Sequence, residues 1–135
     1  MEKVLITGVS GFVGSNLAEA LLQKGYQVKG IDNLSQGAER NMAVFIKHPH
    51  FSFYKEDICN AEALERLSRD VDCIAHLAAF KIPRYGGAHK TLLINSHGTE
   101  NILEVSRKYN IRVLFSSTSD VYGKNPKVPF AEDSD

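Results

Sequence analysis

The chain has 135 residues, which is enough for one domain with its own hydrophobic core. Sixteen basic and sixteen acidic side chains give a formal net charge of zero, so the overall charge favours neither nucleic acid nor an anionic membrane as a partner. The sequence has no apolar signal-peptide core and no apolar stretch of membrane-spanning length, so we expect a cytoplasmic protein. Cys59 and Cys73 lack metal-binding spacing, and we expect both to be free thiols.

Apolar runs alternate with amphipathic stretches along the chain, which is the pattern of βαβ units around a parallel sheet buried on both faces. The strands are predicted at 3–7, 26–32, 51–58, 71–79 and 111–117. The helices are predicted at 12–24, 39–48, 61–70 and, from about Thr91 to Tyr109, in the second half of the chain. Residues 80–90 and 124–135 are predicted to be irregular, because they are rich in glycine, proline or charge. We therefore predict a doubly wound parallel α/β sheet of the Rossmann type, with strand order 3-2-1-4-5.

A glycine-rich loop, "TGVSGFVG", joins the first predicted strand to the first predicted helix. Gly8, Gly11 and Gly14 allow a tight turn, close approach of a pyrophosphate to backbone N–H groups, and close packing of helix on strand. The alternative is a glycine-rich turn without a ligand. The flanking strand and helix favour a dinucleotide site.

Asp32 ends the second predicted strand, eighteen residues after Gly14. This is close to the spacing of about twenty expected for a carboxylate that binds the adenosine ribose hydroxyls. Such a carboxylate would repel a 2′-phosphate, so the prediction is NAD and not NADP. The alternative for Asp32 is a turn-forming role beside Asn33.

Further candidates lie at the ends of the later strands. Asp57, with Ile58 beside it, could meet the edge of the adenine, or could form an Asx turn or cap the next helix. Residues 76–79, "HLAA", end the fourth predicted strand with small side chains against which a dinucleotide could lie, and a buried strand end is the alternative. We expect a structural role for His76, and a solvated loop and not a zinc site for "HPH" at 48–50.

Six motifs in this order, "TGVSGFVG", "DNLSQG", "DI", "HLAA", "NSHGT" and "SSTSDVYG", resemble the extended short-chain dehydrogenase/reductase family of nucleotide-sugar epimerases and dehydratases. The resemblance covers essentially the whole chain. It implies that NAD lies against a set of residues from each motif. Besides the three glycines and Asp32, this set comprises Phe12, Val13, Asn33, Leu34, Asp57, Ile58, Leu77, Ala78, Ala79, Lys81, Asn95 and Ser116.

The resemblance also implies a reaction in which the sugar C4 is transiently oxidised by NAD. Such enzymes use a Ser or Thr that binds the C4 hydroxyl, here Thr118, and a Tyr followed four residues later by a Lys. The cation is needed because a phenol titrates near 10, too high for a base at neutral pH. None of the five tyrosines has a lysine at this spacing, although Tyr85 comes nearest. We therefore interpret residues 1–135 as an NAD-binding Rossmann domain, incomplete at the C-terminus, that precedes the Tyr-x-x-x-Lys helix and the substrate lobe.

Ser119 and Asp120 follow Thr118, where the family's dehydratases have adjacent Asp and Glu. An epimerase acting on a UDP-type sugar is therefore favoured, a sugar-acid decarboxylase stays open because it has a serine and then an acid there, and Asp120 could instead cap the loop. The 135 residues by themselves could also be a cofactor-binding module without turnover, or a partly ordered fragment that binds no ligand. The expected partners are a nucleotide sugar and a second copy of the chain, through the helix at 91–109.

Overall fold

The computed structural model describes residues 1–81, 87–124 and 128–133 and contains a five-stranded sheet. All strand pairs are parallel and the order is β3-β2-β1-β4-β5, which confirms the predicted topology. The strands are β1 (Lys3–Thr7), β2 (Gln27–Ile31), β3 (Phe51–Tyr54), β4 (Cys73–His76) and β5 (Arg112–Phe115). All five predicted strands are present. Apart from the strand at 3–7, each one is shorter than the apolar run from which it was predicted.

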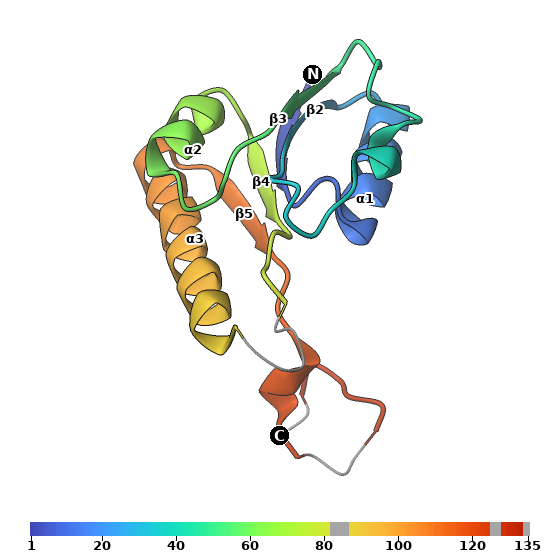
Figure 1. Ribbon diagram of the computed structural model, residues 1–135. Coiled ribbons are helices and arrows are strands. Elements are labelled where there is room, and N and C mark those ends of the chain that lie inside the picture. Colours follow the sequence, from blue (N-terminus) through green and yellow to red (C-terminus); the bar gives the residue numbers. More distant parts are fainter. Residues whose placement is uncertain (82–86, 125–127, 134–135) are drawn as a thin grey trace.

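Helices cover both faces of the sheet (Figure 1). Helix α1 lies on one face, and α2 and α3 lie on the other. The strands supply both cores, since Val4 and Ile6 pack toward α1 whereas Leu5 between them packs with residues of α2 and α3. The helices are α1 (Phe12–Gln23), α2 (Ala61–Ser68) and α3 (Ala88–Tyr109), with short 3₁₀ helices η1 (Glu39–Met42) and η2 (Ser119–Tyr122).

The helix ends follow from local chemistry. Gly25 has a φ of +83°, and the N–H groups of Gly25 and Tyr26 donate to Leu22 O and Leu21 O, a Schellman ending for α1. The side chain of Asn60 accepts from Ala63 N at 3.2 Å and caps α2. Asn110 ends α3 with a φ of +52°, the left-handed conformation that Asn tolerates.

The predicted helix at 39–48 is wrong. Only its first four residues form η1, and the rest is a series of turns. Met42 and Phe45 are buried, but Val44 and Ile46 on the other sides are exposed, so just two positions three residues apart face the core. Met42 O accepts from both Phe45 N at 3.0 Å and Ile46 N at 2.8 Å, so the segment forms tight turns, and two buried side chains provide too little packing to stabilise a longer helix.

Helix α3 begins at Ala88, three residues before its predicted start at about Thr91. Residues 88–90 contain no helix breaker, and Thr91 N donates to Gly87 O at 2.9 Å in the first turn. The irregular segment therefore ends earlier than predicted. Its residues 82–86, which include the candidate base Tyr85, lie outside the described residues. In the described parts of the chain, no helix is both long and apolar enough to span a membrane.

Candidate functional site

The loop after β1 has a shape that requires glycine at two positions. Gly8 has a φ of +74°, and a Cβ there would lie 2.9 Å from the backbone of Ala78 at the end of β4. A Cβ at Gly14 would overlap the carbonyl oxygen of Gly8 and lie 2.8 Å from Val9 Cα. These close approaches bring β1, β4 and α1 together at one end of the sheet.

Helix α1 begins directly after this loop, with Gly11 as its N-cap residue. Gly11 has no side chain, and in the described residues no side-chain cap bonds to the first turn of α1. The N–H groups of the first helical turn therefore face the loop with a partial positive charge, which favours an anion. Phe12 and Val13, in this turn, are 83% and 60% exposed and line the same side of the loop.

Asp32 follows β2, and both of its carboxylate oxygens accept backbone hydrogen bonds. Oδ2 accepts from Ser10 N at 3.0 Å, and Oδ1 accepts from Leu34 N at 2.8 Å. The first bond ties the glycine loop to the end of β2, and the second holds Leu34 in a left-handed conformation with a φ of +60°. The turn-forming alternative is thus observed, while the lone pairs that remain on each oxygen leave room for a ligand hydroxyl.

Asp57 lies close to Asn33, whose side-chain Nδ2 donates to Oδ2 of Asp57 at 2.8 Å. Oδ1 of Asp57 accepts from Cys59 N at 2.8 Å, which is an Asx turn. Burial raises the pKa of Asp57, but the hydrogen bonds from Cys59 and Asn33 outweigh it and lower the pKa below its ordinary value. The local role considered from the sequence is therefore seen, and Asn33 and Ile58, not Asp57 itself, line the cavity described below.

The end of β4 is held by β1. Thr7 Oγ1 accepts from the backbone N–H groups of Leu77 and Ala78 at 3.2 and 3.1 Å, and lies 2.7 Å from Nδ1 of His76. On the other side of the imidazole, Nε2 lies 3.1 Å from Thr99 Oγ1 on α3. His76 is thus a buried residue with two hydrogen-bond partners, in line with the structural role expected from the sequence.

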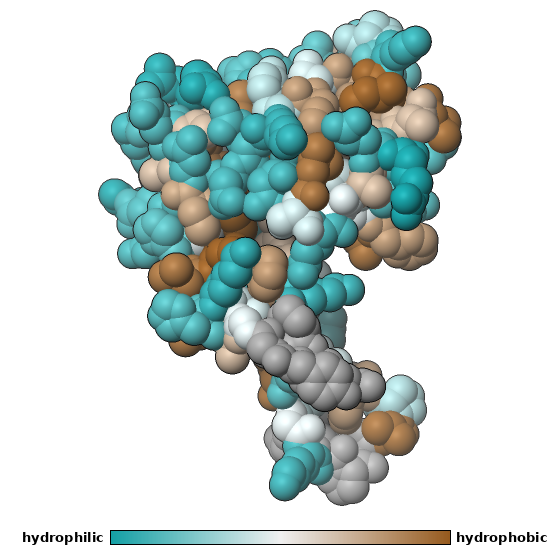
Figure 2. Space-filling view, viewed as in Figure 1, coloured by the Kyte–Doolittle hydropathy of each residue, from teal (hydrophilic) through white to brown (hydrophobic). Residues whose placement is uncertain are grey.

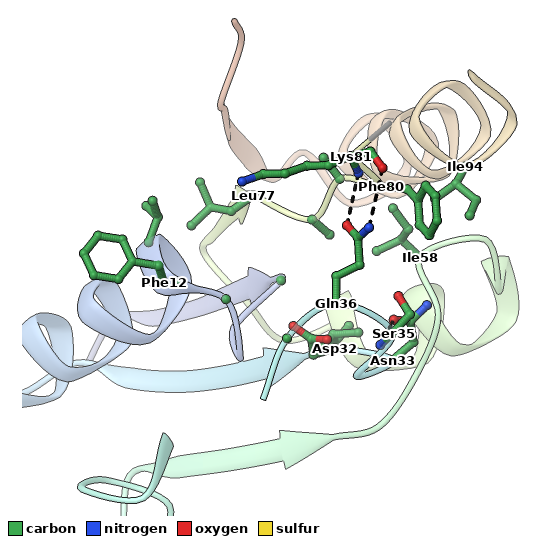
Figure 3. Close-up of a pocket in the computed structure, with 18 of the residues that line it drawn as sticks. Phe12, Asp32, Asn33, Ser35, Gln36, Ile58, Leu77, Phe80, Lys81 and Ile94 are labelled. Atoms are coloured by element: carbon green, nitrogen blue, oxygen red, sulfur yellow. Dashed lines mark hydrogen bonds between the residues drawn. The ribbon is translucent and has the colours of Figure 1, made fainter. Parts of the chain in front are cut away.

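A side-chain bridge crosses the site from the loop after β2 to the segment after β4 (Figure 3). Gln36 Oε1 accepts from Lys81 N at 3.1 Å, and Gln36 Nε2 donates to Lys81 O at 3.5 Å. Next to it, Asn95 Oδ1 accepts from Phe80 N at 2.7 Å and Nδ2 donates to Phe80 O at 3.2 Å. Helix α3 and the loop after β2 therefore both hold the segment 78–81 over the sheet end.

These elements enclose a cavity of about 820 Å³ at the carboxyl ends of β1, β2 and β4. Its size falls in the range of ligand-binding pockets. Twelve of the predicted site residues line it: Gly8, Gly11, Phe12, Val13, Gly14, Asp32, Asn33, Ile58, Leu77, Ala78, Ala79 and Lys81.

Six predicted residues do not line this cavity. Leu34, Asp57 and Asn95 lie in its supporting turns and helix, whereas Ser116, Thr118 and Asp120 lie beyond β5 and are exposed. Thr118 Oγ1 accepts from Asp120 N at 3.2 Å at the start of η2. The structure therefore does not place the predicted catalytic pair against the cavity.

Sequence reasoning missed several lining residues. Gln36 is one, although it lies within the motif "DNLSQG", because a bridge between residues 45 positions apart has no local signal. In the described part of the chain there is no group of three or more His, Cys, Asp or Glu side chains that could hold a metal ion. The remaining missed lining residues are Ile31, Ser35, Gly37, Asn41, Glu56, Phe80 and Ile94.

The cavity fits a dinucleotide. Uncapped N–H groups suit a pyrophosphate, the close contacts at Gly8 and Gly14 leave the loop surface bare, and Asp32 presents a carboxylate across the opening. The cavity lies at the point where the strand order reverses between β1 and β4, the usual ligand position in open α/β sheets.

Comparisons with known proteins agree with this geometry. A family model described as GDP-mannose 4,6 dehydratase matches residues 5–135. UDP-glucuronic acid decarboxylase 1 from Danio rerio is 38% identical over 134 residues, which cover 98% of this chain and 31% of that protein.

Two solved structures have similar folds. The dTDP-glucose 4,6-dehydratase of Bacillus anthracis str. Ames, in complex with NAD, has a TM-score of 0.86 and 32% identity over 100% of this chain and 44% of that chain. The UDP-glucose 4-epimerase of Bifidobacterium longum, in complex with NAD⁺ and UDP, has a TM-score of 0.86 and 27% identity over 98% of this chain and 42% of that chain. The chain thus spans less than half the length of each of these proteins.

Proposed function

The chain belongs to the GDP-mannose 4,6 dehydratase family, and we propose that its cavity binds NAD and that it is the NAD-binding part of a nucleotide-sugar-modifying enzyme. One observation carries the proposal most directly. The glycine loop, the uncapped start of α1 and the Asp32 carboxylate line a single cavity at the switch point of the sheet. The resemblance inferred from six sequence motifs is confirmed at the level of the family.

In this proposal each part of the cavity binds one part of the dinucleotide. The first turn of α1 binds the pyrophosphate through backbone N–H groups. Asp32, which Ser10 N and Leu34 N hold in place, accepts from the adenosine ribose hydroxyls and repels a 2′-phosphate. NAD, when bound, supplies the hydride acceptor for oxidation of the sugar at C4.

In the proposed reaction a Tyr-x-x-x-Lys pair transfers the proton, and these 135 residues contain no such pair. Thr118 is the candidate partner for the C4 hydroxyl, but no tyrosine of the chain has a lysine four residues later. We propose that the Tyr-x-x-x-Lys pair and the substrate lobe belong to sequence outside these residues. A positioned proton transfer contributes roughly 10²- to 10⁴-fold to rate. The 135 residues alone are therefore expected to bind NAD without measurable turnover.

Two finer reactions are candidates. An epimerase of a UDP-type sugar would re-reduce the 4-keto sugar from its other face, and a solved epimerase of similar fold was obtained with NAD⁺ and UDP. A decarboxylase of a sugar acid would lose carbon dioxide from the 4-keto intermediate. The order Thr118, Ser119, Asp120 and the similarity to a UDP-glucuronic acid decarboxylase support this second reaction, so we propose it as an alternative of equal standing.

Calorimetric titration of the purified chain with NAD and with NADP tests the first part of the proposal. We expect saturable NAD binding and at least about tenfold weaker NADP binding, equivalent to 1.4 kcal/mol. Circular dichroism and urea unfolding confirm that the sample is folded. A folded chain that binds neither dinucleotide would contradict the proposal.

The reaction is tested on a longer protein that contains this chain and a Tyr-x-x-x-Lys. Incubation with UDP-glucose and with UDP-glucuronic acid, followed by chromatography of the products, separates epimerisation from decarboxylation. Turnover by the 135 residues alone, after repurification from host enzymes, would show that the base lies within them.

Self-association is a further part of the proposal. Helix α3 has Ile102 buried on its own sheet, whereas Leu92, Leu93 and Leu103 are 68%, 57% and 55% exposed. In Figure 2, viewed as in Figure 1, brown apolar surface is visible among hydrophilic side chains on the side of the molecule where α3 lies. We expect a dimer by light scattering at high concentration, and dissociation when Leu92 and Leu93 are both replaced by Ser. A monomer at all concentrations would contradict this expectation.

A further inference from the structure

The hydroxyl of Thr7 is the central atom of a buried hydrogen-bond group between β1, β4 and α3. Thr7 is 0% exposed and His76 is 3% exposed. Three groups lie within hydrogen-bond distance of Thr7 Oγ1: Leu77 N at 3.2 Å, Ala78 N at 3.1 Å and His76 Nδ1 at 2.7 Å. Any change in this hydroxyl therefore acts directly on the backbone at the end of β4.

The chemistry of the hydroxyl assigns the proton positions. A threonine hydroxyl has one hydrogen to donate and two lone pairs to accept. When the backbone N–H groups of Leu77 and Ala78 occupy both lone pairs, the Thr7 hydrogen is left to point at His76 Nδ1, 2.7 Å away. In this arrangement Nδ1 carries no hydrogen, and Nε2 carries one and faces Thr99 Oγ1 at 3.1 Å. The arrangement corresponds to a neutral His76 in a single tautomer.

This tautomer matters because the two amides lie in the wall of the cavity. Leu77 and Ala78 line it, and Gly8 packs so closely that its Cβ, if it had one, would lie 2.9 Å from Ala78 N. Leu77 N has a second acceptor, Thr7 O at 3.3 Å. Within the described residues Ala78 N has Thr7 Oγ1 as its one hydrogen-bond acceptor, so its position depends most on the hydroxyl.

We propose that His76 is a positioning residue for the dinucleotide site: by accepting from Thr7 through Nδ1, it keeps the Thr7 hydroxyl oriented toward the amides of Leu77 and Ala78 and so sets the wall against which the dinucleotide lies. The inference rests on the proposed NAD binding for its effect on affinity. The hydrogen-bond arrangement itself is independent of any ligand.

Protonation of His76 would reverse the direction of the hydrogen bond between its Nδ1 and Thr7 Oγ1. An imidazolium donates through both nitrogens, and Thr7 Oγ1 could accept from Nδ1 only by releasing a backbone amide. Burial lowers the pKa of His76 below its ordinary value, so the neutral form is present above that value and is lost only as the pH falls through the lowered pKa. Thr7 from β1, Thr99 from α3 and the ring of Phe115 from β5 face the imidazole, and in the described residues no charged side chain forms a hydrogen bond or an ion pair with it or shifts its pKa.

Two amide substitutions separate the two sides of the ring. In His76→Asn the side-chain amide takes the place of Nδ1 and can still accept from Thr7, whereas in His76→Gln it reaches the place of Nε2 and Thr99. We expect exchange of the Ala78 amide hydrogen, measured by NMR, to be up to about tenfold faster in His76→Gln and in Thr7→Val than in the unmodified chain. In His76→Asn and in Thr99→Val it should change less than about threefold.

NAD affinity should follow the same order. We expect about three- to tenfold weaker binding in His76→Gln and little change in His76→Asn, with urea unfolding showing that both are folded. In the unmodified chain the affinity should fall as the pH falls through the pKa of His76, which lies below its ordinary value of 6.5, and in His76→Asn this fall should disappear.

Nitrogen NMR of histidine-labelled, unmodified protein tests the tautomer without any substitution. An unprotonated Nδ1 and a protonated Nε2 at neutral pH support the inference, and a protonated Nδ1 overturns it. Equal amide exchange in His76→Asn and His76→Gln would also overturn it, because the ring would then act by packing alone. If the chain binds no NAD, the proposed function fails, but the tautomer and the exchange rates still decide the role of His76.

Discussion

The carboxyl ends of β1 and β5 differ sharply, although a motif expected to contact the cofactor follows each strand. β1 lies between β2 and β4, and every residue from Val4 to Thr7 is buried. Among the described strands β5 pairs with β4 alone, and its Leu114 and Phe115 are each 56% exposed. The segment after β5 extends away from the sheet, while the loop after β1 turns back into α1 (Figure 1).

This difference shows which part of the site the chain builds by itself. The loop after β1 is shaped by contacts with β2, β4 and α1, so its geometry is set by the fold. Thr118, after β5, has one side-chain hydrogen bond in the described residues, to the amide of Asp120 two positions later. The fold therefore fixes the walls of the cavity around the loop after β1, whereas Ser116, Thr118 and Asp120 after β5 do not line it.

The largest effect is expected from a substitution that distorts the backbone of the loop after β1. In Gly14→Ala the new methyl group would overlap Gly8 O, a backbone atom that cannot move without shifting β1. We expect a loss of at least about 2 kcal/mol in the free energy of unfolding, measured in urea, and NAD binding weaker by about 100-fold.

The matched control is Gly25→Ala, at the far end of α1. Gly25 also has a positive φ, of +83°, but a Cβ there would meet nothing within 4 Å. We expect a loss of about 1 kcal/mol from backbone strain and no change in NAD affinity. Equal effects of the two substitutions on NAD affinity would show that the loop contacts are unimportant for binding.

The next effect concerns charge at the end of β2. Asp32→Asn keeps one oxygen that can accept from Leu34 N, but it replaces the oxygen that accepts from Ser10 N by an amide NH2 and removes the negative charge that faces the proposed ribose. We expect NAD affinity to fall about tenfold and the preference for NAD over NADP to shrink, both measured by calorimetry. Unchanged preference would remove Asp32 from cofactor selection and leave it the turn-forming role alone.

A smaller effect is expected from the bridge between Gln36 and Lys81. Its two hydrogen bonds are exposed, so each contributes at most about 1 kcal/mol. In Gln36→Ala we expect NAD to dissociate a few-fold faster in stopped-flow fluorescence, because the segment after β4 loses its tie across the cavity. Gln23→Ala, which removes an exposed hydrogen bond on α1, is the control and should have no effect.

The same contrast explains how much the sequence could predict. Strand order, the glycine loop and Asp32 were accessible because apolar runs and glycine spacing are local signals of a buried parallel sheet. The helix predicted at 39–48 failed because Met42 and Phe45 are the only apolar residues within 39–48, all of them described, that are buried in the core. The bridge from Gln36 to Lys81 and the Thr7 group depend on contacts across 45 or more residues, which no local pattern encodes.

The smallest effect is expected for Thr118→Val after β5, and Thr7→Val at the end of β1 is the comparison that makes it informative. Thr118→Val removes a hydroxyl whose one hydrogen bond in the described residues is to an exposed amide, so we expect the free energy of unfolding to change by less than about 0.5 kcal/mol and NAD affinity to stay the same. Thr7→Val removes a fully buried hydroxyl with three partners, and should lower the free energy of unfolding by about 1–3 kcal/mol. Urea unfolding and calorimetry of the two variants measure the contrast directly. If Thr118→Val weakened NAD binding as much as Thr7→Val, the residues after β5 would already be part of the cofactor site, and the distinction between the two strand ends would be wrong.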